Sequence, residues 1–219
     1  SRGMILEAMG DEMVYVNGIP RSGNPYGLKD TWESWEPHFD YSLLPVLLNR
    51  GRNVLLFRSN RGALKVRLYP PRLPVMFNRR DVTFPDLLPG ESFDTWCSMV
   101  VVNASPRPVA SCSIHPSLNG KECPPTPIPM IPPFSVRKVK WRITGDAPRE
   151  KIGVRMFCKL QQRAANGGEI DLDTVSLVLR VVDGAANRRE TFVSAIDSSV
   201  QYYGVLPPRH ASPHPALYL

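Results

Sequence analysis

The sequence predicts an all-β protein that contains two β-sandwiches. Proline is abundant, with 23 among 219 residues, and the apolar runs are short, which disfavours helices. Turn-forming pairs such as Asn17-Gly18 separate runs that are rich in β-branched and aromatic residues. Residues 64–68 alternate apolar and basic side chains, as on a strand with one buried face.

Residues 1–72 are expected to form the first sandwich, of jelly-roll type. The stretch 19–27 holds two prolines and several polar residues, so it is expected to be a loop. Asn49 to Asn53 is expected to be a second turn. The strands are expected at 4–8, 13–16, 43–48, 54–57 and 63–68.

Residues 73–186 are expected to form an immunoglobulin-like sandwich. Residues 81–91 are read as a connecting loop, and the proline-dense stretch 121–133 cannot be a central strand. Six or seven short strands over this length fit such a sandwich. They are expected at 75–77, 93–102, 109–114, 135–143, 151–160 and 174–182.

The last segment, 187–219, is predicted to open with a β-hairpin. Its strands are expected at 191–196 and 199–205, and Asp197-Ser198 supplies the turn. A proline-containing loop follows, and then residues 216–219 begin an apolar strand. Because an apolar strand is seldom left open at a chain end, we expect the polypeptide to continue or another chain to cover this end.

The segments TFVSAIDSSVQYYGVLPP and PALYL resemble the opening hairpin and first buried strand of the α/β-hydrolase domain in bacterial prolyl-oligopeptidase-type serine hydrolases. The pair Ser198-Ser199 departs from that pattern, where glycine is more usual. VYVNG and PVLLNRGRNVLLFR are similar to galactose-binding-like jelly rolls.

This resemblance implies a non-catalytic accessory region of a serine peptidase or esterase. The region would position and partly cover the active site of a catalytic α/β-hydrolase domain, on the same polypeptide or on a second chain. The implied contacts with that domain are Phe192, Tyr202, Tyr203 and Tyr218.

The chain itself is not expected to be an enzyme. The nucleophile elbow G-x-S-x-G is absent, as are HExxH, the P-loop and GxGxxG. No catalytic residue and no cofactor are therefore assigned. The pair Asp171 and Asp173 suggests calcium only weakly, because the rest of a ligand loop is missing, so no metal site is assigned.

The four cysteines leave two alternatives open. None belongs to a CxxC pair, which argues against zinc. Cys97, Cys112 and Cys158 lie in apolar runs and are expected to be buried free thiols. If the protein is exported from a bacterial cell, a disulfide that includes Cys123 is the alternative, and the localisation is left open.

The net charge of +7 is interpreted as a solvated basic surface. An acidic partner is the alternative, but no nucleic-acid-binding motif accompanies the basic residues, so no nucleic acid is expected. No apolar run approaches 18 residues, so no membrane partner is expected either. A homo-oligomer is a further open alternative.

The stretch 29–40 carries clustered aromatic residues. Trp32, Trp35 and His38 are candidate ligand contacts, because aromatic rings suit sugar rings and apolar groups. Anchoring of the loop by its tryptophans is the favoured alternative. The same residues support a second functional hypothesis, a stand-alone carbohydrate- or ligand-binding β-sandwich module.

Overall fold

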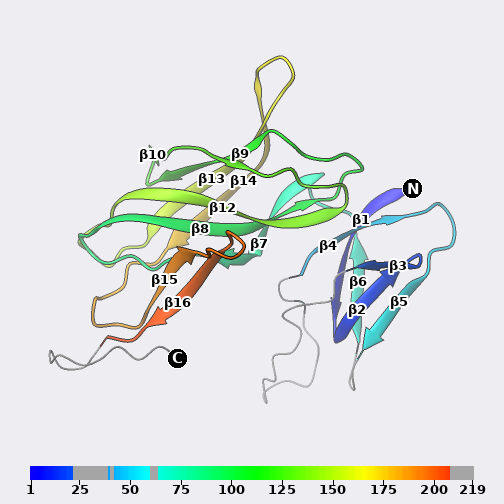
Figure 1. Cartoon of the computed structure of the whole chain (residues 1–219), viewed down its shortest axis with the longest axis horizontal. Coiled ribbons are helices and arrows are strands. Elements are labelled where there is room, and N and C mark those ends of the chain that lie inside the picture. The colour runs from blue at the N-terminus through cyan, green and yellow to red at the C-terminus, as the bar shows by residue number, and fades with distance from the viewer. Residues whose placement is uncertain (22–38, 40–41, 60–63, 208–219) are drawn as a thin grey trace.

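The computed structural model describes residues 1–21, 39, 42–59 and 64–207, which form sixteen strands and no helix (Figure 1). The pairings between these strands are antiparallel. The all-β class predicted from the sequence is therefore confirmed. Within the described residues there is no helix long and apolar enough to cross a membrane.

The first six strands form an N-terminal sandwich of two three-stranded sheets. One sheet has the order β4-β1-β6 and the other β3-β2-β5. Alternate residues such as Leu6, Val14 and Val46 are buried together, because successive strand residues point to opposite faces. The strands are β1 (Arg2–Met9), β2 (Asp11–Val16), β3 (Ile19–Arg21), β4 (Leu44–Leu48), β5 (Leu55–Ser59) and β6 (Lys65–Tyr69).

The expected loop at 19–27 begins with a strand, β3. Asn17 and Gly18 have φ angles of 52° and 81°, the conformation that a tight hairpin turn requires. This turn lets β3 pair with β2 despite Pro20, which is tolerated because β3 lies at the edge of its sheet.

The next eight strands form a central sandwich. One sheet has the order β12-β8-β7, and the other has the order β10-β9-β13-β14 with β11 also paired to β9. Trp141 from the first sheet and Ile114 and Leu160 from the second are fully buried in the shared core. The strands are β7 (Val75–Thr83), β8 (Ser92–Asn103), β9 (Cys112–Leu118), β10 (Lys121–Glu122), β11 (Thr126–Ile128), β12 (Ser135–Asp146), β13 (Val154–Arg163) and β14 (Glu169–Leu179).

Several sequence expectations change in the central sandwich. The strands expected at 151–160 and 174–182 lie at 154–163 and 169–179. β7 continues to Thr83 instead of ending at Phe77, and its register to β8 shifts between Asn78 and Val82. The strand expected at 109–114 lies instead at 112–118. The proline-rich stretch 121–133 contributes β10 and β11, which are short and pair with β9 alone, the placement that prolines allow.

The outer face of the sheet β12-β8-β7 is covered by the N-terminal sandwich. Ile5 of β1 packs with Met76, Val100 and Val102, which are all buried. Gly3 lies against the same sheet so closely that an added Cβ would be 2.7 Å from the Ala104 carbonyl oxygen. Glycine at position 3 is therefore required by close packing.

A buried carboxylate also joins the two sandwiches. The Glu7 side chain of β1 is 2% exposed and accepts hydrogen bonds from Arg67 and Tyr69 of β6 and from Arg80 of β7. The ring of Phe39 lies 4.2 Å from the Arg67 guanidinium. Glu7 thus holds side chains from both sandwiches in one place.

The last two strands form a separate hairpin, β15 (Arg188–Val193) and β16 (Val200–Val205). In the described part of the chain they pair only with each other, so nothing there begins the α/β-hydrolase sheet that was expected. The hairpin packs on β8, where the Thr191 hydroxyl donates to the Trp96 carbonyl oxygen at 2.7 Å. Residues 216–219, expected to form the next strand, lie outside the described residues.

Cys97, Cys112 and Cys158 are buried free thiols, as predicted, and Cys123 is also a buried free thiol. Burial raises the pKa of Cys158 to about 12, and the neighbouring Cys123 adds to this effect. Burial, with Cys158 and Cys123 nearby, also raises the pKa of Cys97 well above its ordinary value. These thiols are therefore held protonated in the core.

Candidate functional site

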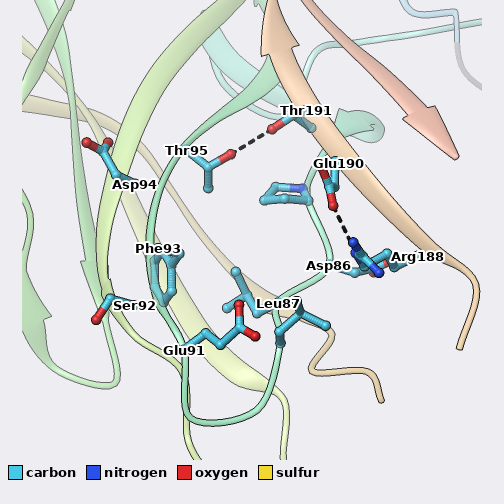
Figure 2. A pocket seen from close by; sticks show the side chains of 12 residues that line it. Asp86, Leu87, Glu91, Ser92, Phe93, Asp94, Thr95, Arg188, Glu190 and Thr191 are labelled. Carbon is cyan, nitrogen blue, oxygen red and sulfur yellow. Dashed lines mark hydrogen bonds and ion pairs between the residues drawn. The ribbon is translucent and has the colours of Figure 1, made fainter. Parts of the chain in front are cut away.

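A polar cleft lies where the start of β8 meets the C-terminal hairpin. Its volume is about 290 Å³. Figure 2 shows Ser92, Phe93 and Asp94 on one side of the hollow and Arg188, Glu190 and Thr191 on the other. The lining residues are Pro85, Asp86, Leu87, Leu88, Glu91, Ser92, Phe93, Asp94, Thr95, Arg188, Glu190 and Thr191.

Arg188 and Glu190 form the polar pair on the β15 side. Two residues apart on a strand, they point to the same face, and Arg188 Nε donates to Glu190 Oε1 at 2.8 Å. The Tyr203 hydroxyl donates to the other carboxylate oxygen. The bond from Tyr203, together with Arg188, lowers the pKa of Glu190. Glu190 is therefore held as a carboxylate.

Asp94 lies on the β8 side of the cleft, and its carboxylate points away from the hollow (Figure 2). Arg142 of the neighbouring β12 donates to both of its carboxylate oxygens. The Arg142 hydrogen bond lowers the pKa of Asp94. Because both carboxyls are held ionised, they suit hydrogen-bond acceptance better than general-acid catalysis.

The two walls of the cleft are fixed to each other by side-chain hydrogen bonds. Asp86 accepts two bonds from Arg180, at 2.8 and 2.7 Å, and one from the backbone N–H of Arg189 at 2.8 Å. The hydroxyls of Thr95 and Thr191 lie 2.9 Å apart across the cleft (Figure 2). A site built this way is largely preformed, which limits the entropy lost on binding.

The sequence-predicted ligand contacts Trp32, Trp35 and His38 lie outside the described residues. Tyr218, one of the four expected domain contacts, also lies outside them. The other three are on the hairpin and exposed, with Phe192 at 45%, Tyr202 at 60% and Tyr203 at 45%.

Sequence reasoning missed Arg188, Glu190 and Asp94. A signal was present for the first two, since residues 188, 190 and 192 alternate along one strand face and place Arg, Glu and Phe in a row. Asp94 had no such signal, because its partner Arg142 is 48 residues away in the sequence.

The residues that had suggested calcium do not form a metal site. Asp173 is buried and accepts from Arg72 at 2.6 Å and from the Phe77 N–H at 2.8 Å. Asp171 accepts from Gln161. Across the described ranges no group of three or more His, Cys, Asp or Glu residues could hold a metal ion.

Comparison with known proteins gives distant structural likenesses. No family model and no curated protein matches the chain. A CARDB domain from Pyrococcus furiosus is similar at 12% identity and a TM-score of 0.31, over 50% of this chain and 94% of that one. A candidate β-galactosidase from Bacteroides fragilis is similar at 12% identity and a TM-score of 0.40, over 93% of this chain and 32% of that one.

A calcium-binding mutant of β-glucuronidase 2 from Bacteroides uniformis is similar at 11% identity and a TM-score of 0.41, over 92% of this chain and 26% of that one. The chain thus spans about a third or less of these two glycoside hydrolases. At such identities and TM-scores the likenesses say nothing about ligand or activity.

The predicted membership of the prolyl-oligopeptidase-type family is wrong. The structural neighbours are glycoside hydrolases and a CARDB domain, and no family model or curated protein links the chain to serine hydrolases. The expectation of a serine peptidase or esterase falls with it. What remains is a β-sandwich module with a preformed polar cleft.

Proposed function

We propose that this chain is a non-catalytic binding module and that it takes a carbohydrate in the cleft between β8 and β15. The observation that carries the proposal is the Arg188–Glu190 pair in the lining of a cleft of about 290 Å³. A sugar offers adjacent hydroxyls, each of which both donates and accepts. An arginine fork beside a carboxylate offers the matching donors and acceptors in fixed positions.

The remaining lining supports the same class of ligand. The hydroxyl oxygens of Thr95 and Thr191 add acceptors, and Phe93 offers an apolar surface for the C–H face of a sugar ring. A pocket of mostly polar groups with one aromatic side chain is poorly suited to a wholly apolar ligand, because its polar groups would lose water without replacement.

The proposal is tested by screening the purified chain on a glycan array and titrating each hit by calorimetry. At least one glycan class is expected to bind. Glu190→Gln and Arg188→Met are each expected to weaken binding about tenfold, since each removes one or more charge-assisted hydrogen bonds. Glu12→Gln breaks a distant surface pair, Glu12 with Arg58 at 3.0 Å, and is expected to leave binding unchanged.

The absence of any glycan hit would overturn the proposal. Equal binding by the wild type and both cleft variants would also overturn it. If binding is lost in Trp32→Ala or Trp35→Ala but kept in both cleft variants, the aromatic loop predicted from the sequence is the site and the cleft is not.

A further inference from the structure

The outer face of the hairpin continues the cleft as an aromatic surface. Cross-strand partners in an antiparallel pair share a face, and Glu190 is directly opposite Tyr203. Strand alternation puts Arg188 and Phe192 on that same face. The cleft pair and two aromatic rings therefore form one row on the hairpin.

The two rings of this row are exposed and close together. Phe192 and Tyr203 are each 45% exposed, and their centroids lie 6.0 Å apart with 50° between the ring planes. The Tyr203 hydroxyl is bonded to Glu190, which fixes the ring next to the polar pair. An aromatic surface held in place by a cleft residue differs from scattered exposed side chains, which are common on any protein.

The polar pair of the cleft and this aromatic pair lie in one row. We infer that the ligand is an oligosaccharide that runs along the hairpin from one pair to the other, rather than a single sugar. This inference rests on the carbohydrate-binding function proposed above. The row from residue 188 to residue 192 is roughly 13 Å long at the rise of an extended strand. That length exceeds one pyranose ring, so a monosaccharide cannot reach the cleft pair and Phe192 together.

The chemistry along the row changes in the way a sugar chain requires. At the cleft end, Arg188 and Glu190 offer hydrogen bonds to hydroxyl groups. At the far end, the two rings offer stacking for the apolar C–H face of a sugar, with little cost in side-chain entropy. The sugar nearest the cleft gives orientation, and those over Tyr203 and Phe192 add affinity.

The test uses the whole chain and β-1,4-linked gluco-, galacto-, manno- and xylo-oligosaccharides. Each is titrated as the monosaccharide, the trisaccharide and the hexasaccharide. For the sugar that binds, the hexasaccharide is expected to bind at least tenfold more tightly than the monosaccharide. Phe192→Ala is expected to remove most of this difference and to leave monosaccharide binding unchanged.

Two further variants separate the roles along the row. Tyr203→Phe keeps the ring and removes the bond to Glu190, so it is expected to weaken the monosaccharide and hexasaccharide by the same factor. Tyr202→Ala removes an aromatic residue from the opposite face of the hairpin, where Arg189 lies over its ring, and is expected to change neither.

The outcomes distinguish this inference from the proposed function. If every sugar fails to bind, the carbohydrate-binding function itself is wrong. If sugars bind through Glu190 but with the same affinity at every length, the function stands and the extended ligand is wrong. A loss of hexasaccharide binding in Tyr202→Ala equal to that in Phe192→Ala would also overturn the assignment of the outer face.

Discussion

At the scale of single residues, the buried thiols make the stability of the protein depend on alkaline pH. The ordinary thiol pKa is 9.0, and Cys158 is raised to about 12 in the folded chain. Between these values the folded state keeps a proton that the unfolded state releases. Stability contributed by the neutral thiol is therefore fully present below pH 9 and is lost as pH rises toward 12.

We expect the free energy of unfolding to fall above pH 9 by up to about 1.4 kcal/mol per pH unit for each such thiol. Cys158→Ala is expected to be less stable at pH 7 but to lose less stability between pH 9 and 11. Urea unfolding followed by tryptophan fluorescence at several pH values measures both. An identical pH dependence in variant and wild type would show that Cys158 does not titrate in this way.

Glu7, with its buried carboxylate, is a second residue whose substitution is expected to lower the free energy of unfolding. Glu7→Gln keeps the shape but removes the charge that Arg67, Tyr69 and Arg80 bind. We expect a loss of about 2 kcal/mol, as for a charged hydrogen bond in a buried site, with the half-exposed arginines returning partly to water. Urea unfolding at neutral pH measures the loss.

Glu12→Gln is the matched control for Glu7→Gln, since Glu12 is a glutamate of β2 in the same sandwich and pairs with the exposed Arg58. Exposed pairs contribute about 0–1 kcal/mol, so this change is expected to be small. If the two substitutions lower the free energy of unfolding equally, the hydrogen bonds to Glu7 do not stabilise the contact between the two sandwiches.

At the scale of elements, β1 can lie close against the central sandwich because Gly3 has no side chain. A Cβ there would be 2.7 Å from a backbone oxygen and 3.0 Å from the Phe134 ring, and the backbone cannot move away cheaply. Gly3→Ala is expected to destabilise the protein by roughly 1–3 kcal/mol through overpacking.

Gly184→Ala is the control for Gly3→Ala, because an added Cβ at Gly184 has no neighbour within 4 Å. It is expected to be neutral or slightly stabilising, since alanine restricts the unfolded chain. Thermal unfolding compares the two variants. If Gly3→Ala melts with the wild type, the close approach of β1 is wrong.

The elements also show what the sequence could predict. Residues 64–68 alternate cleanly, and a strand does lie there, β6 at 65–69, paired with β1 in one sheet. The buried face that the alternation predicted is not found, since Val66 and Leu68 are each 38% exposed. β8 does not alternate in its second half, where residues 97–103 are all buried. Its apolar run at 99–102 is typical of a strand covered on both faces, but the run itself does not say what covers it.

The cleft could not be predicted for a related reason. Thr95 and Thr191, which face each other across it, are 96 residues apart, and no local pattern links them. The hairpin was predicted from β-branched residues and a turn, which are local signals. The packing of the hairpin on β8 was not predicted, because it depends on the topology of the whole chain. The resemblance used in its place led to the wrong family.

At the scale of the whole molecule, the two sandwiches are expected to unfold together. They share the apolar cluster around Ile5 and Val102, the ion pair between Glu7 and Arg80, and the close contact at Gly3. Breaking either sandwich would expose this shared surface, so partial unfolding costs much of the stability of the remainder. We expect one calorimetric transition whose calorimetric and van't Hoff enthalpies agree.

Two separated transitions in the wild type would contradict this expectation. Arg80→Ala removes one link between the sandwiches while leaving Arg67 and Tyr69 on Glu7. If this link couples the sandwiches, this variant is expected to broaden the transition. A sharp transition at the same temperature as the wild type would show that the coupling comes from the apolar cluster alone.

The position of β8 has a consequence for how the sequence can change over evolutionary time. β8 touches the N-terminal sandwich through Val100 and Val102 on its outer face, and nearer its start it touches the hairpin through Thr95 and the Trp96 carbonyl oxygen. A substitution on this strand must be accommodated by a segment far away in the chain. Position 102 is therefore expected to covary with position 5, and position 95 with position 191, among descendants of a common ancestor.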